Sequence, residues 1–433
     1  MTEEVEQKRP TLEGEAALRL WRQGPDAWNS WIDQHPGWNI SFEGVDFSTE
    51  RDPYGNLSFA DYHFGDGNVN FSNATFGKGD VRFFGAIFSG DNVDFSGTNF
   101  GDGNVIFYDT AFGHANMYFA GATFGTGNVY FSDAKFGNGD LYFYGTNFGD
   151  GDLYFYDTTF GKGEINFSQT QISNLHFSPE TTGTSHIKAE GLSIKGRAIF
   201  NLPPSAARLK SFNLHSASFD GPLTLRGNLS IIPDLRGTRY SHQVDLSDLK
   251  VKLPRISPTL GWPPKLSLVA EDPQDGARLR RLKEIAETNK DHQAALRFSA
   301  DENRAKRWIE TSWFGSVLDM AFSAFSNYGQ SILRPSFWLG VIFALSMYAY
   351  KAKQIPKLAT DGWADWVQAA LLSASNSLPF LPQSRELRTG ALQALYDTTD
   401  PSSFIDALMI TQGVLSFIFL FLIGLGLRNR FRL

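Results

Sequence analysis

Phenylalanine at a fixed interval constrains the fold of this 433-residue sequence more than any other feature. Two Phe ladders run through its first half, and in each ladder the next Phe follows twelve residues later. A short fixed period with an obligatory bulky residue indicates a solenoid, in which each coil buries the face of its neighbour. The first ladder is Phe64, Phe76, Phe88, Phe100, Phe112, Phe124, Phe136, Phe148 and Phe160, and the second is Phe59, Phe71, Phe83, Phe95, Phe107, Phe119, Phe131, Phe143, Phe155 and Phe167.

The residues around each Phe repeat as well, giving the unit V-x-F-S-x-A/T-x-F-G-x-G-D/N. An apolar or small residue two positions before a Phe lies on the same face of an extended segment, so both side chains point inward. The F-G-x-G-D/N segment supplies the positive φ angles and Asx turns that a corner requires. Phe spacings of five and seven do not fit a period of 3.6, which argues against helices here.

These V-x-F and A-x-F units resemble the pentapeptide-repeat family. The segment ALRLWRQGPDAWNSW at residues 17–31 resembles the short helical cap that opens many members. The resemblance implies a right-handed quadrilateral β-helix with a central Leu or Phe and a small residue pointing inward. Family units have five residues, whereas these alternate between five and seven, so we expect coils of about 24 residues with two bulged corners.

The expected domains follow from changes in composition and periodicity along the chain. They are an N-terminal helical cap at 1–38; a pentapeptide-repeat-like β-helix at 39–253, regular over 59–177 and irregular over 185–253; a Pro-rich linker at 254–273; an amphipathic helical neck at 274–310; an interfacial helix at 311–334; and a membrane domain at 335–433.

Two apolar runs in the last domain, 336–352 and 404–427, are long enough, or nearly so, to cross a bilayer as helices. A third span through 313–333 is the alternative to an interfacial helix there. The segment 361–380 between the two runs suggests a short amphipathic helix followed by polar, irregular backbone. Such backbone is tolerated at membrane depth only where protein buries it or where it lines water, so we expect a re-entrant helix and loop.

The order of span, short helix, irregular polar backbone and span resembles the two-helix pore unit of tetrameric cation channels. The likeness is one of layout over about the last hundred residues, and the potassium filter T-V-G-Y-G is absent, so potassium selectivity is not implied. The resemblance implies a homotetramer. Its filter candidates are Ser375, Asn376, Ser377, Leu378, Pro379 and Phe380.

Polar residues in the second span are candidates for lining a pore. Gln412 and Ser416 fall on one helical face, which Leu420 and Ile423 continue. Polar groups within a span usually face water or a partner. Hydrogen bonding between helices explains Gln412 and Ser416 equally well, so both interpretations stay open.

Charge divides the chain into an acidic front and a basic rear. Residues 40–177 hold seventeen acidic and five basic side chains, whereas residues 274–433 hold fourteen and eighteen. The first ten residues are charged and do not read as a secretory signal. Basic residues flank the outer ends of both apolar runs, which predicts a multi-pass protein of the bacterial inner membrane with cytoplasmic N- and C-termini.

The expected partners are the lipid bilayer, further copies of the chain and an unidentified ion. The acidic repeats resemble family members that imitate DNA, but a membrane domain argues against a nucleic-acid partner. Outward aromatic residues offer a stripe for a cytoplasmic protein or a sugar, although tyrosine is also simply favoured on strands. They are Tyr108, Tyr118, Tyr130, Tyr142, Tyr144, Tyr154 and Tyr156.

No catalytic motif is visible, so we expect neither an enzyme nor a cofactor. The chain has no cysteine, its eight histidines are scattered, and G-x-S-x-G, H-E-x-x-H and phosphate-loop motifs are absent. The repeated Gly-Asp pairs read as corners and not as calcium sites. Two functions remain: an oligomeric ion channel-like protein with a cytoplasmic β-helical scaffold or sensor, and a membrane-anchored scaffold that does not conduct.

Overall fold

The computed structural model describes residues 9–259, 261–359, 362–378, 382–398 and 401–431. The chain divides into two compact units. The first holds the chain up to Ser257 together with Ala270–Ala305, and the second holds Pro258–Val269 and Lys306–Leu433.

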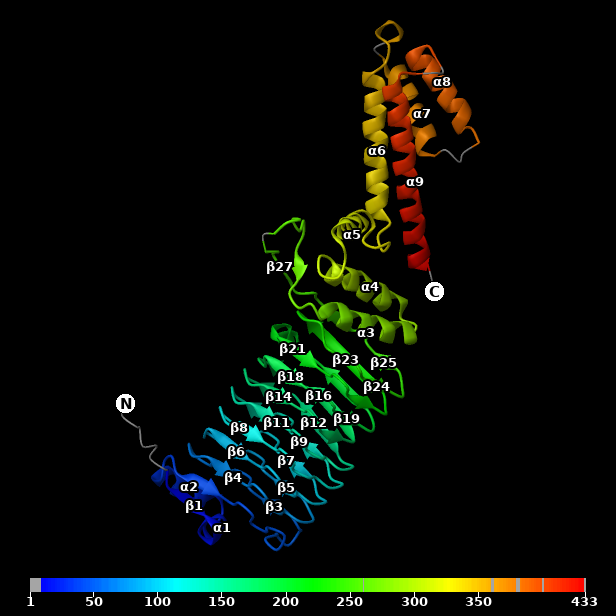
Figure 1. The fold of residues 1–433 in the computed structure, drawn as a ribbon. Coiled ribbons are helices and arrows are strands. Elements are labelled where there is room, and N and C mark those ends of the chain that lie inside the picture. The colour runs from blue at the N-terminus through cyan, green and yellow to red at the C-terminus, as the bar shows by residue number, and fades with distance from the viewer. Residues whose placement is uncertain (1–8, 260, 360–361, 379–381, 399–400, 432–433) are drawn as a thin grey trace, which may run out of the picture. The chain divides into compact units, whose positions relative to one another are not determined.

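The first unit is a parallel β-solenoid of about ten turns, followed by helices (Figure 1). Its short strands stack into four parallel ladders within the described residues. The longest two contain β1 (Thr11–Glu13), β2 (Asn39–Ser41), β4 (Val69–Asn70), β6 (Asn92–Asp94), β8 (Asn116–Tyr118), β11 (Leu141–Tyr142), β14 (Ile165–Asn166), β18 (His186–Lys188) and β21 (Ser211–Asn213); and β3 (Leu57–Ser58), β5 (Val81–Arg82), β7 (Val105–Ile106), β9 (Val129–Tyr130), β12 (Asp152–Tyr156), β16 (Asn174–Ser178), β20 (Ala198–Asn201), β23 (Leu223–Leu229) and β25 (Val244–Asp245), with β26 (Leu249–Val251) beside β23.

The two shorter ladders lie in the later coils. They contain β10 (Lys135–Phe136), β13 (Thr159–Phe160) and β17 (Thr181–Thr182); and β15 (Gln171–Ile172), β19 (Ser193–Ile194), β22 (Ser218–Phe219) and β24 (Arg239–Tyr240). A short 3₁₀ helix, η1 (Pro204–Arg208), interrupts the later coils, and β27 (Arg255–Ile256) and β28 (Val269–Ala270) lie in the segment expected to be an irregular linker.

Residues that pair between coils in the regular part are 24 positions apart, as in Val69 with Val93 and Val81 with Val105. This register places each Phe above the Phe of the coil before it. Every Phe of both ladders is at most 6% exposed, which confirms that they point inward. Their rings stack nearly parallel, with centroids 4.9 Å apart for Phe83–Phe107. The core of the solenoid is therefore a set of continuous aromatic columns.

The corners use glycine for two different reasons. Gly121, between Phe119 and Phe124, has a φ of +68°, and other coils place Gly, Asp or Asn with a positive φ at the same position of the repeat. The second glycine of F-G-x-G differs. A Cβ on Gly127 would lie 2.1 Å from the carbonyl oxygen of Gly103, in the coil before it, without a positive φ at Gly127. The expectation of a positive φ is wrong for this glycine, because close approach of the backbones between coils requires it.

Threonines occupy some of the small inward positions. Each is fully buried and satisfies its hydroxyl by donating to a Phe carbonyl 27 residues earlier, which removes the cost of burying a polar group. The bonds run from Thr98 to Phe71, Thr110 to Phe83, Thr146 to Phe119, Thr158 to Phe131 and Thr170 to Phe143, at 2.7–2.8 Å.

Helices close both ends of the solenoid core. At the amino-terminal end lie α1 (Gly14–Trp21) and α2 (Pro25–Gln34), and Trp28 is buried against Phe42 and Phe64. At the other end α3 (Asp275–Thr288) and α4 (His292–Lys306) join the same hydrophobic core. These caps cover the exposed edges that an uncapped solenoid would present to other chains.

The second unit is helical. Its elements are α5 (Trp313–Ser326), α6 (Leu333–Ala352), the 3₁₀ turn η2 (Pro356–Leu358), α7 (Trp363–Ser377), α8 (Ser384–Tyr396) and α9 (Ser403–Phe431). In the described part of the chain, α9 is the one helix both long and apolar enough to cross a membrane, judged by length and composition. The expected span 404–427 lies inside it, and the expected span 336–352 lies inside α6.

Two elements bear on the expected layout of this unit: α5 is too short for the alternative of a third span, and α8 was not expected. The 14 residues of α5 end at Ser326 and extend about 21 Å, less than the roughly 30 Å that a third span needs. The helix α8 follows the expected re-entrant segment, where no element was expected. Its sequence signal is the helical spacing of Ala391, Leu392 and Leu395, which are all buried.

Candidate functional sites

The helix α7 reaches only part of the way along α6 and α9. It begins beside the carboxyl end of α6, where Lys351 Nζ lies 2.8 Å from Asp365 Oδ2. Near its other end, Ser373 Oγ donates to the carbonyl oxygen of Phe343, in the middle of α6. Its 15 residues extend about 22 Å, whereas α9 has 29 residues. The carboxyl end of α7 therefore lies about halfway along its two neighbours.

At that level a buried polar cluster joins the three helices. Gln412 of α9 is its centre: Nε2 donates to Ser373 Oγ at 2.7 Å and to Ser377 Oγ at 2.9 Å, and Oε1 accepts from Tyr350 at 2.7 Å. Asn376 Nδ2 donates to the Tyr350 hydroxyl at 3.4 Å. We call Tyr350, Ser373, Asn376, Ser377, Gln412 and Ser416 the interhelical cluster. It fixes α6, α7 and α9 against one another at one depth.

The structure brings together some of the site residues expected from sequence. Within one protomer, Asn376 and Ser377 face Gln412 and Ser416, and Ser416 Oγ donates to Ser377 Oγ at 3.3 Å. These contacts favour hydrogen bonding between helices as the explanation for the polar residues of α9. The other candidates make no such contact: Ser375 Oγ donates to Leu372 O of its own helix, while Leu378, Leu420 and Ile423 are partly buried. Pro379 and Phe380 lie outside the described residues.

The helix α8 turns back along α7. Tyr396 donates from its hydroxyl to the carbonyl of Tyr350 at 2.9 Å, and Ile355 N donates to Leu395 O, so α8 ends near the carboxyl end of α6. Its apolar face packs against Ala369 and Leu372 of α7 in a shared cluster. Figure 1 shows α7 and α8 beside α6 and α9. Together α7 and α8 form a helical hairpin, a feature that the sequence did not reveal.

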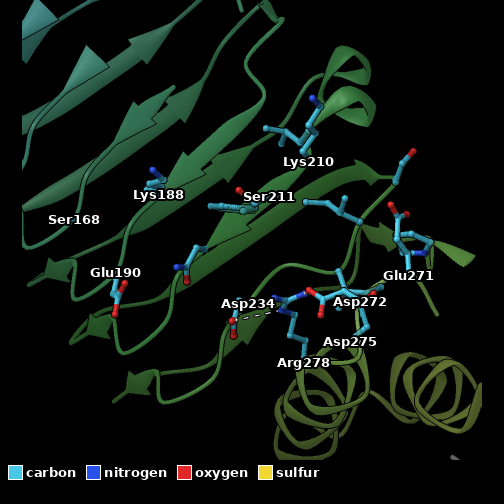
Figure 2. Close-up of a pocket in the computed structure, with 17 residues that line it drawn as sticks. Ser168, Lys188, Glu190, Lys210, Ser211, Asp234, Glu271, Asp272, Asp275 and Arg278 are labelled. Atoms are coloured by element: carbon cyan, nitrogen blue, oxygen red, sulfur yellow. Dashed lines mark hydrogen bonds and ion pairs between the residues drawn. The ribbon is translucent and has the colours of Figure 1, made fainter. Parts of the chain in front are cut away.

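A second concentration of polar groups lines a pocket in the first unit. The cavity of about 820 Å³ lies between the last coils and the start of α3 (Figure 2). One guanidinium meets three carboxylates there: Arg278 lies 2.6 Å from Asp272, 2.8 Å from Asp275 and 3.5 Å from Asp234. Arg236 also pairs with Asp234, at 2.7 Å. This cluster could not be predicted from the sequence, because its members come from two separate segments of the chain.

Charge is not balanced in this cluster, since three carboxylates share two guanidinium groups. Asp275 is the most buried, and its burial raises the pKa of the carboxyl group to about 6 in spite of the contact with Arg278. Burial alone would also raise the pKa of Asp234, but hydrogen bonds and charge from Arg236 outweigh it and hold that pKa below its ordinary value. No group of His, Cys, Asp and Glu among the described residues is suited to hold a metal ion.

No protein-family model, curated protein or solved structure matches this chain. The interhelical cluster and the hairpin of α7 and α8 supply the features that bear most directly on what the second unit does.

Proposed function

We propose that this protein is an oligomeric, ion channel-like protein of the bacterial inner membrane, with a cytoplasmic β-solenoid as scaffold or sensor. In this proposal both α6 and α9 cross the bilayer and both termini are cytoplasmic. The observation that carries it is the hairpin of α7 and α8, which stops about halfway along α6 and α9. A tether has no need of a hairpin that enters the bilayer and leaves on the same side.

The depth of the hairpin follows from α9. Asp406 stands at the start of its apolar stretch, and Ser416, which contacts the end of α7, lies ten residues further. Ten residues of helix rise about 15 Å, half of a hydrocarbon core of about 30 Å. The end of α7 thus falls near the middle of the bilayer. Non-helical backbone at that depth must be buried in protein or line water.

A closed oligomer meets this requirement. One protomer buries the polar side of α7 through the interhelical cluster, but exposes the far side of α8. Further copies around a symmetry axis would enclose that side together with water. Four copies match the two-helix pore unit whose layout the sequence resembles. Large apolar side chains exposed along α9, among them Phe417 and Phe421, suit contact with lipid.

The proposal includes a square, pentapeptide-repeat type of solenoid. Four parallel ladders and pairing partners 24 residues apart support four sides per coil, with two V-x-F and two A/T-x-F segments in each. Its outward tyrosines Tyr108, Tyr144 and Tyr156 are 42–56% exposed and offer a surface to a cytoplasmic protein. The acidic surface keeps such a domain solvated in the cytoplasm.

A membrane-anchored scaffold that does not conduct is the second candidate. The observation in its favour is that one protomer satisfies the polar side chains of the interhelical cluster internally. Those side chains therefore need no water-filled pore to explain them. In this alternative the second unit serves only to hold the solenoid at the membrane.

The two candidates differ in assembly and in conduction. The full chain is purified in detergent, its oligomeric state is measured by native mass spectrometry, and flux of several cations and anions is measured after reconstitution into liposomes. We expect a tetramer that conducts. A matched pair of variants tests the site: Gln412→Ala removes the centre of the interhelical cluster and should reduce flux, whereas Phe421→Ala, on an exposed face, should not. A monomer or dimer without flux of any ion would leave the scaffold candidate.

A further inference from the structure

After the buried Ser384, the next six residues of α8 are exposed on every side in the protomer. Residues 385–390, with the sequence RELRTG, are all exposed, and we call them the charged turn. It contains Arg385, Glu386 and Arg388, two cations against one carboxylate. No ion pair joins either arginine to another residue in the described part of the chain. The second half of α8 differs, because it is packed against α7.

The charged turn lies deeper in the hairpin than the packed half. Tyr396 is held at the carboxyl end of α6 by its bond to Tyr350, and Arg388 is eight residues earlier in α8. Eight residues of helix extend about 12 Å. Because α8 starts shortly after the end of α7, which lies about halfway along α6, the charged turn is directed toward the middle of the bilayer in the proposed orientation.

Charged side chains at that depth cannot face acyl chains without a large cost in free energy. The neighbouring helices offer no compensation, because α6 has no charged residue between 336 and 350 and α9 has none between 407 and 427. The carboxylate of Asp365 is already paired with Lys351. The charged turn must therefore face water, together with the same turn of other copies.

We propose that the charged turn lines the aqueous path of the assembly, and that its repeated arginines select small inorganic anions, such as chloride, over cations. This inference rests on the proposed function and specifies its ion. Rings of Arg or Lys are a known way to build an anion pore, whereas cation pores use rings of carboxylates or carbonyls. Each copy contributes two positive charges, from Arg385 and Arg388, and one negative charge, from Glu386. The ring of charged turns therefore has a net positive charge in any symmetric oligomer.

The absence of cysteine allows a direct test on the full-length protein in liposomes. Arg388→Cys introduces the one thiol of the chain. We expect that thiol to react with water-soluble methanethiosulfonates. A reagent that adds a sulfonate should reduce the chloride flux of this variant. A reagent that adds an ammonium group, used on a separate sample, should raise the flux toward that of the parent protein. Ile418→Cys, on an exposed apolar face of α9, is the matched control and should react slowly with both.

Selectivity provides the second measurement. The permeability ratio of chloride to potassium should favour chloride in the parent protein, and Arg388→Glu should lower it by about tenfold or more, since each copy contributes a reversed charge. Glu386→Gln should raise it or leave it unchanged. Native mass spectrometry of each variant shows that the assembly persists. Cation-selective flux that Arg388→Glu leaves unaltered would overturn this inference alone, whereas no flux of any ion would overturn the proposed function with it.

Discussion

Truncation of Phe107 to alanine should destabilise the solenoid more than almost any other single substitution in its regular part. Phe107 has no exposed surface, and its ring stacks on those of Phe83 and Phe131 with centroids 4.9 and 4.8 Å away. The edges of Phe95 and Phe119 close the sides, at 5.9 and 6.0 Å. The alanine variant would therefore leave a cavity in the middle of an aromatic column.

The expected cost follows from these contacts. A buried Phe→Ala substitution costs about 3–5 kcal/mol when the surroundings do not collapse into the cavity. Collapse is restricted here, because the coils above and below are held by backbone hydrogen bonds such as Phe107 N to Tyr130 O. Ring pairs each contribute about 0.5–1.5 kcal/mol beyond their buried area. The free energy of unfolding should thus fall by about 5 kcal/mol, at the upper end of the range.

The control lies at the next position. Tyr108 is 42% exposed and stacks only on the exposed ring of Phe84, so Tyr108→Ala should cost about 1 kcal/mol or less. Guanidinium unfolding of the full chain in detergent, followed by far-ultraviolet circular dichroism, gives both values by linear extrapolation. Similar losses for the two variants would refute the inward register of the Phe ladders.

Three further predictions concern the corners, the pocket and the interhelical cluster. Gly127→Ala should destabilise the solenoid more than Gly121→Ala, because the new Cβ at position 127 would lie 2.1 Å from a backbone oxygen. Position 121 has open space, so alanine there incurs only the cost of a positive φ, about 1–2 kcal/mol. Thermal unfolding compares the two variants, and equal losses of stability would contradict the close-approach argument. The pKa of Asp275 is about 6 in the folded state, above its ordinary value of 3.8, so the folded state binds the proton more tightly than the unfolded state. The free energy of unfolding should therefore rise by up to about 3 kcal/mol as pH falls from 7 toward 4. Asp275→Asn should abolish this dependence in pH-resolved thermal unfolding, and an unchanged profile would assign it to other groups. Gln412→Leu should weaken the packing of α7 by about 2 kcal/mol, since hydrogen bonds between helices in membranes contribute about 0.6 kcal/mol each and the polar groups that Gln412 contacts stay buried. Amide hydrogen exchange in α7 should become faster. Unaltered exchange would count against a role of the interhelical cluster in holding α7.

Much of the solenoid could be predicted from the sequence, and less of the membrane unit. The apolar runs predicted the positions of α6 and α9. The helix α8 was missed, because its apolar spacing, at Ala391, Leu392 and Leu395, is short and follows a charged stretch. Gly127 was identified from its spacing but assigned the wrong reason. A positive φ is a local property that a turn motif predicts, whereas close approach to Gly103 depends on the neighbouring coil.

The sequence by itself determined which side chains of the repeat point inward. Alternation along an extended segment and a constant repeat are local properties, so Phe107 and the rest of its ladder could be placed without knowledge of any distant contact. Only the tertiary structure decided which polar groups meet. Gln412 finds Ser377 on another helix, and Arg278 finds Asp234 on the last coils, across long stretches of chain. Periodicity carries no information about such pairs, because chain reversals and helix packing bring them together, and their burial sets both the hydrogen bonds and the raised pKa of Asp275.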